Sequence, residues 1–103
     1  MALYDGSIEE LTGAGAIGLE TLFTHVTSTG TDALTIADGG HGQRKIITLK
    51  VDGGTATLTP TTAAGYTTIA FADAGDTTEI QYFDNVGWVV NSLGGLSGGP
   101  TVA

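Results

Sequence analysis

The sequence predicts an all-β fold, a small antiparallel β-sandwich or barrel of about seven to eight short strands. From residue 16 onward, threonine, valine and isoleucine recur with a period near two, as in strands that bury one face. Turn signals that contain glycine or aspartate separate these runs at intervals of roughly 8–12 residues. We expect strands at residues 16–20, 22–27, 33–37, 44–51, 55–60, 67–71, 77–83 and 87–91.

Helix signals are weak. Ser7-Ile-Glu-Glu10 has the form of a capping box, in which Ser7 is the N-cap and Glu10 is at N3. Three glycines follow at positions 13, 15 and 18, so any helix here is limited to about one turn.

Asp52-Gly53-Gly54 predicts a tight hairpin between the strands at 44–51 and 55–60, because aspartate and glycine reach the positive φ that such turns need. Alternation on either side of this turn gives an inward set. Its members are Ile47, Leu49, Val51, Ala56, Leu58, Ile69, Phe71, Ile80, Tyr82, Trp88 and Val90.

A chain of 103 residues forms one domain with one modest core. We expect residues 16–91 to form the β domain. Residues 1–15 carry few core candidates and predict an N-terminal arm. Residues 92–103 are glycine-rich and uncharged, and predict a C-terminal arm that is disordered or that orders on a neighbour.

The chain has a net charge of -8 and only three cations, too few for nucleic-acid binding by phosphate neutralisation or for an anionic membrane. It has no cysteine, which excludes disulfides and thiolate metal sites. The start lacks the basic and apolar regions of a secretory signal.

All three cations, Arg44, Lys45 and Lys50, lie on one predicted strand. They are either scattered surface charges or a patch that meets acidic groups on a partner. The predicted C-terminal arm adds apolar side chains that are able to lie on a partner. The candidate partner-binding set is therefore Arg44, Lys45, Lys50, Leu93, Leu96 and Val102.

No catalytic or cofactor site is expected. Gly13-Ala-Gly-Ala-Ile-Gly18 matches a dinucleotide-binding spacing but lacks the flanking strand and helix. His25 and His41 have no metal-ligand spacing. Asp73, Asp76 and Glu79 suit calcium by type, but turn hydrogen bonds are the favoured role of the two aspartates.

The aromatic residues Tyr66, Tyr82, Phe83 and Trp88 leave two functions open. If they are exposed, they form a platform for a carbohydrate or receptor. Tyr82 and Trp88 are the better core candidates, because large aromatic side chains supply much of the burial in small domains.

Residues 33–91 carry several motifs in a fixed order: Asp38-Gly-Gly-His-Gly-Gln-Arg-Lys45, Val51-Asp-Gly-Gly-Thr-Ala-Thr-Leu-Thr-Pro60, and Gly87-Trp-Val-Val90. In these motifs the chain resembles a β-rich module of tailed-bacteriophage structural proteins, which include small capsid decoration (cement) proteins and the ends of fibre proteins.

The resemblance implies a non-enzymatic virion protein, assembled in the host cytoplasm and placed on the capsid surface. It implies a homotrimer that binds the major capsid protein and stabilises the head, without nucleic acid or membrane as partner. The short length favours decoration, and a receptor-binding fibre tip is the alternative.

Overall fold

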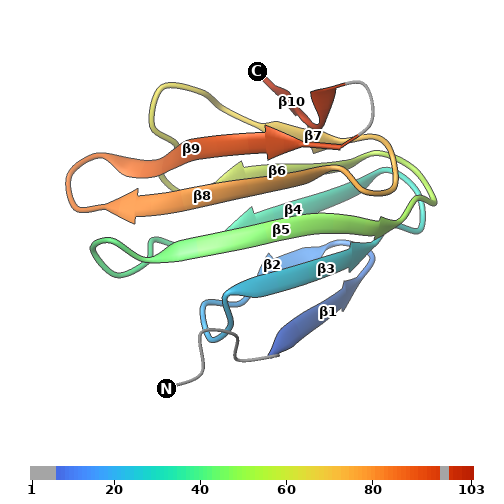
Figure 1. Cartoon of the computed structure of the whole chain (residues 1–103), viewed down its shortest axis with the longest axis horizontal. Coiled ribbons are helices and arrows are strands. Elements are labelled where there is room, and N and C mark those ends of the chain that lie inside the picture. The colour runs from blue at the N-terminus through green and yellow to red at the C-terminus, as the bar shows by residue number, and fades with distance from the viewer. Residues whose placement is uncertain (1–6, 96–97) are drawn as a thin grey trace.

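The computed structural model describes residues 7–95 and 98–103. It confirms the all-β class, with ten strands and no α-helix in these residues (Figure 1). The strands are β1 (Ile8–Thr12), β2 (Gly15–Ile17), β3 (Phe23–Thr27), β4 (Asp32–Ile36), β5 (Arg44–Val51), β6 (Ala56–Pro60), β7 (Ile69–Phe71), β8 (Thr77–Phe83), β9 (Gly87–Gly94) and β10 (Thr101–Val102).

The strands form two five-stranded sheets. Sheet A has the order β1-β3-β5-β8-β9, and sheet B has the order β10-β7-β6-β4-β2. Both sheets are mixed, whereas antiparallel sheets were expected. In sheet A, β1, β3 and β5 are parallel, and β8 and β9 complete the sheet by antiparallel pairing. Sheet B repeats this arrangement with β2, β4 and β6 parallel and β7 and β10 antiparallel to their neighbours.

The parallel pairs arise because the chain winds from one sheet to the other. Each of three successive coils crosses from sheet A to sheet B: β1 to β2, β3 to β4, and β5 to β6. Strands that follow the same direction in stacked coils must pair in parallel. After β6 the direction of the chain reverses: β7 runs antiparallel to β6 in sheet B, and β8 runs antiparallel to β5 in sheet A. The chain then crosses once more from sheet A to sheet B, from β9 to β10.

The expected hairpin at Asp52-Gly53-Gly54 is wrong, because β5 and β6 lie in different sheets. The turn is an arch that stacks on the arch of the preceding coil. Ser28 Oγ accepts a hydrogen bond from Gly53 N at 2.8 Å and donates to Gly54 O at 2.7 Å. A Cβ atom at residue 53 would overlap the carbonyl oxygen of Ser28, so this close stacking requires glycine.

One core lies between the two sheets, and both contribute to it. Its buried members are Ile17, Val26, Leu34, Ile36, Ile47, Leu49, Ala56, Leu58, Ile69, Phe71, Ile80, Tyr82 and Trp88. The predicted inward set is thus confirmed, with Val90 partly buried against the core, except for Val51. Val51 is 48% exposed because the register shifts between Val26 and Thr27, which makes Lys50 an extra residue and turns Val51 outward.

Among the described residues of the two expected arms, 8–12, 15, 92–94 and 101–102 lie in strands. β1 and β2 build the first coil. β1 includes residues 8–10, where a turn of helix was predicted, so these residues form a strand instead. The C-terminal residues extend β9 to Gly94, and β10 pairs with β7. Winding between the two sheets gives even short, glycine-rich segments a neighbouring strand, and sequence periodicity carries no sign of that neighbour.

Candidate partner-binding face

The outward side chains of sheet A form a face that carries polar, charged and apolar residues, here called the outer face of sheet A. Strand pairing aligns them in rows across the sheet. One row joins Ile8, Phe23, Ile46 and Glu79, and the next joins Glu10, His25, Thr48 and Thr77. An apolar ladder of three side chains on β1, β3 and β5 therefore lies between two groups of charged residues.

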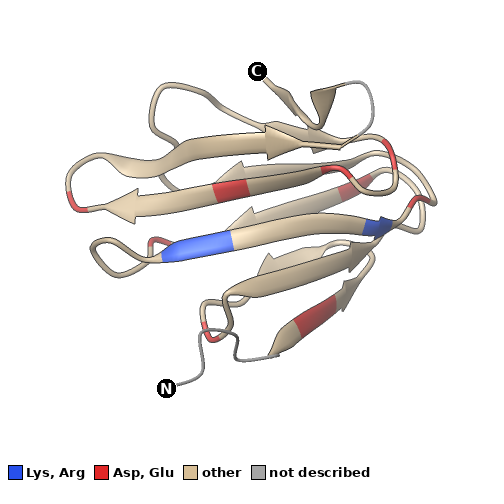
Figure 2. Cartoon of the chain, viewed as in Figure 1, with Lys and Arg blue, Asp and Glu red and all other residues tan. Residues whose placement is uncertain are grey.

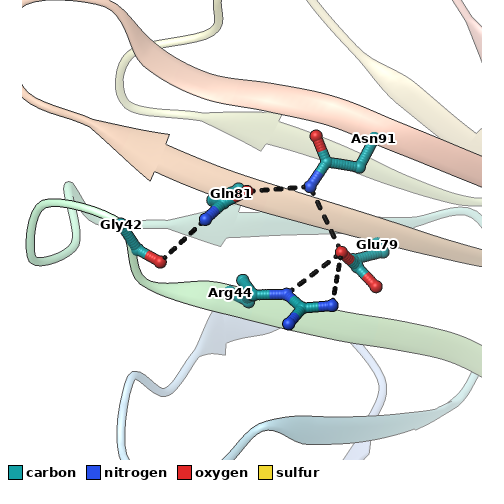
Figure 3. A network of polar contacts seen from close by, with 5 residues as sticks. All are labelled: Gly42, Arg44, Glu79, Gln81 and Asn91. Atoms are coloured by element: carbon teal, nitrogen blue, oxygen red, sulfur yellow. Dashed lines mark hydrogen bonds and ion pairs between the residues drawn. The ribbon is translucent and has the colours of Figure 1, made fainter.

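The first charged group is a hydrogen-bonded network around Glu79 (Figure 3). Arg44 donates to Glu79 Oε2 from Nε at 3.1 Å and from Nη2 at 3.0 Å. Asn91 Nδ2 donates to the same oxygen at 3.2 Å and to Gln81 Oε1 at 3.0 Å. Gln81 Nε2 then donates to Gly42 O at 3.1 Å. The network links β5, β8 and β9 and fixes the orientation of Arg44.

The pKa of Glu79 is lowered first by the hydrogen bond from Asn91, which is larger than the opposing effect of burial, and further by the hydrogen bond and the charge of Arg44. The carboxylate is therefore charged at neutral pH and balances the guanidinium beside it. Arg44 remains 56% exposed and Glu79 is 22% exposed, so the pair is accessible from solvent.

The second charged group lies at the other end of the same face. Lys50 Nζ lies 3.4 Å from Glu10 Oε1, and His25 Nδ1 lies 3.9 Å from Glu10 Oε2. Both side chains of the Lys50–Glu10 pair are more than half exposed, so solvent screens it and it adds little stability. The outer face thus carries two carboxylates and two cations, each cation paired within the face.

Lys45, which was predicted to belong to the contact set, is fully buried and cannot contact a partner. Its Nζ donates to Thr21 O at 2.7 Å and to Thr24 Oγ1 at 2.9 Å, and Thr24 Oγ1 donates to Glu9 Oε1 at 2.8 Å. Burial lowers the pKa of Lys45, and the charge of Glu9 opposes that shift.

Glu9, which is half-buried on β1, completes this chain of polar contacts. Its two carboxylate oxygens accept hydrogen bonds from Gly18 N at 3.1 and 3.0 Å. Alternation along β5 places Lys45 on the face that carries Ile47 and Leu49. The hydrogen-bond partners that permit its burial meet it only through the parallel winding of β1, β3 and β5.

The remaining predicted contact residues do not lie together. Leu93 is 41% exposed on β9 and belongs to sheet A together with Arg44 and Lys50. Val102 lies on β10 in sheet B and packs partly against the core. Leu96 lies outside the described residues. The structure therefore brings Arg44, Lys50 and Leu93 to one sheet.

The outward positions of sheet B differ, because they are small and uncharged. They are Ala16, Ala33, Thr35, Thr57, Thr59, Ala70 and Thr101. Most acidic residues instead lie in the connections at the ends of the strands (Figure 2). The exposed cations of the chain, Arg44 and Lys50, are therefore a feature of sheet A alone.

The aromatic residues do not form a platform. Trp88 is fully buried, its Nε1 donates to Ala37 O at 2.9 Å, and its ring meets Tyr82 edge-on with centroids 5.5 Å apart. Tyr66 donates to Trp88 O at 2.9 Å. Phe83 follows Tyr82 at the end of β8 and meets the ring of His41 edge-on, with centroids 5.8 Å apart. This arrangement removes the support for a carbohydrate-binding surface.

The other candidate motifs have local roles. Asp76 Oδ2 accepts hydrogen bonds from Ala72 N and Asp73 N, which confirms a turn role for Asp76. His41 Nδ1 accepts one from Asp84 N at 3.0 Å. Gly13–Gly18 spans the turn between β1 and β2 together with β2 itself.

Within residues 7–95 and 98–103, no pocket and no group of three potential metal-ligating side chains is found. No helix in this part of the chain is long and apolar enough to cross a membrane. Comparison with known proteins found no matching family model and no match among curated sequences.

Proposed function

We propose that this chain is a capsid decoration protein of a tailed bacteriophage. It binds the outside of the assembled head as a homotrimer, contacts the major capsid protein and stabilises the shell without catalysing a reaction. It is assembled in the host cytoplasm and stays on the virion surface. The resemblance of residues 33–91 to decoration modules supports this assignment.

The observation that carries the proposal is the outer face of sheet A. Each of its two cations is already paired with a carboxylate of the same face in the free chain. The face therefore has almost no net charge, although the chain has a net charge of -8. A neutral, prearranged face avoids repulsion by an acidic partner and loses little side-chain entropy on binding. The apolar ladder of Ile8, Phe23 and Ile46 adds area that is able to become dry in a complex.

Co-sedimentation with shells of tailed-phage major capsid protein that lack decoration protein tests this proposal. Arg44→Ala leaves Glu79 without its cation on the outer face of sheet A, and should weaken binding roughly tenfold or more, as for truncation of a charged interface residue. Thr35→Glu is the matched control, because it makes the same change of net charge on the outward side of sheet B.

The proposal predicts saturable binding of the parent and of Thr35→Glu, with a clear loss for Arg44→Ala. Failure of the parent to bind the shells would overturn the function. Equal binding by all three proteins would overturn the assignment of the face.

A further inference from the structure

Sheet A has an open edge on each side within the described residues. β1 pairs only with β3, and β9 pairs only with β8 apart from one bridge between Ala63 and Trp88. Unpaired strand edges are templates for pairing with another chain. The edges of sheet B are shorter, since β2 has three residues and β10 has two.

The backbone groups that face outward from β1 follow from its hydrogen bonds. Gly13 N donates to Thr27 O on β3, so Leu11 and Glu9 also face β3 by alternation. The N–H and C=O groups of Ile8, Glu10 and Thr12 therefore point away from the sheet.

The second edge, β9, is free only in its second half. Trp88 N donates to Thr62 O and Ala64 N donates to Trp88 O, so this side of β9 is covered at its beginning. By alternation the N–H of Val90 also points to this side, but no described residue covers it. The remaining part of β9, Val90–Gly94, contains a bulge at Asn91, where the register with β8 shifts, so by alternation its outward backbone groups are those of Val90 and Leu93.

The directions of the two edges also agree. β9 is antiparallel to β8, and β8 is antiparallel to β5, so β9 runs parallel to β5, β3 and β1. When β9 of one copy is placed beside β1 of another, sheet A continues with parallel pairing, as between β1 and β3.

Charge favours this pairing over the alternatives. Two copies of β1 paired antiparallel about their centre would oppose Glu10 to Glu10, and like charges directly opposite are unfavourable. β9 contains no charged residue, so it does not repel Glu10. Pairing of β9 with a second β9 would leave every β1 edge open, whereas pairing of β9 with β1 covers both edges of each copy.

We infer that copies of this chain associate head to tail, with the Val90–Gly94 edge of one copy paired in parallel with the Ile8–Thr12 edge of the next. Such an interface is heterologous and closes into a ring when the rotation permits, which a homotrimer requires. The inference rests on the homotrimer of the proposed function and adds which strand edges join its copies; light scattering needs no capsid, so this inference and capsid binding fail separately.

The test blocks one edge at a time and measures mass in solution by light scattering. Glu10→Pro removes the outward N–H of β1 without removing a hydrogen bond to β3, and Glu10→Ala is its control for the lost carboxylate. Leu93→Lys places a charge on the β9 edge, and Val86→Lys places the same charge on the exposed β8–β9 turn. Circular dichroism checks that each variant is folded.

The parent, Glu10→Ala and Val86→Lys should be oligomeric at micromolar concentration, and both edge variants should be monomeric. An equimolar mixture of Glu10→Pro and Leu93→Lys should give a dimer, because each supplies the edge that the other has lost. A monomeric parent, an oligomeric Leu93→Lys variant, or monomers that persist in the mixture would overturn the inference.

Discussion

Removal of the Trp88 side chain tests the packing on which the whole domain depends. Trp88 is the largest fully buried side chain of the described residues. It contacts Tyr82, donates a hydrogen bond to Ala37 O, and lies at the position where the 62–64 segment joins β9. Trp88→Ala therefore leaves a cavity bordered by both sheets.

Truncation of a buried aromatic side chain to alanine costs about 3–5 kcal/mol. A domain of this size has a total stability of roughly 5–15 kcal/mol, and each kcal/mol shifts Tm by about 4–8 °C. We therefore expect Trp88→Ala to lower Tm by at least about 12 °C. Trp88→Phe keeps a ring beside Tyr82 but loses the hydrogen bond to Ala37, so its loss should be much smaller.

Thermal unfolding followed by far-ultraviolet circular dichroism measures these shifts. Val86→Ala is the control, because Val86 is 51% exposed in a turn and its truncation should change stability by no more than about 0.5 kcal/mol. A Tm of Trp88→Ala within a few degrees of the parent would refute the buried position of Trp88.

Three further predictions concern a turn, a tyrosine and metal ions. Gly53→Ala should lower the unfolding free energy by about 3 kcal/mol, because its methyl group overlaps the carbonyl of Ser28. Gly40→Ala should cost far less, because a Cβ there lies at an ordinary contact distance of 4.0 Å from Gln43 Oε1; similar denaturant midpoints for the two variants would contradict the stacked arches. Burial raises the pKa of Tyr66 from 10.0 to about 12, so the folded state keeps a proton that the unfolded chain loses. Stability should therefore fall as pH rises from 10 to 12, and a denaturation series with Tyr66→Phe should show a weaker fall. Thermal unfolding with excess chelator and with millimolar calcium should coincide, and an upward shift in calcium would contradict the turn role of Asp76.

Local structure was largely predictable from the sequence. Alternation located the strands from β3 to β9 to within a few residues and identified Trp88, Tyr82 and most of the core, because burial of one face leaves a period of two. The strand β1 was missed because Ser7–Glu10 has a helix-capping pattern, whereas β2 overlaps the strand expected at 16–20. The strand β1 forms instead because β3 offers it a full parallel partner.

Topology was not predictable from local signals. Asp52-Gly53-Gly54 suits both a hairpin and an arch between sheets, and only stacking on Ser28 selects the arch. The same winding determines which side chains are exposed at the candidate site. It buries Lys45 beside Thr21 and Thr24 while it leaves Arg44, one residue earlier, on the outer face.

The most direct test of the central claim measures how many copies of the labelled chain sediment with a capsid shell as its concentration rises. The proposed function predicts that binding saturates at a fixed number of copies per shell, that excess unlabelled chain displaces the labelled chain, and that Arg44→Ala shifts the curve to higher concentration. Binding that does not saturate, or the absence of binding by the folded parent, would contradict a role in capsid decoration.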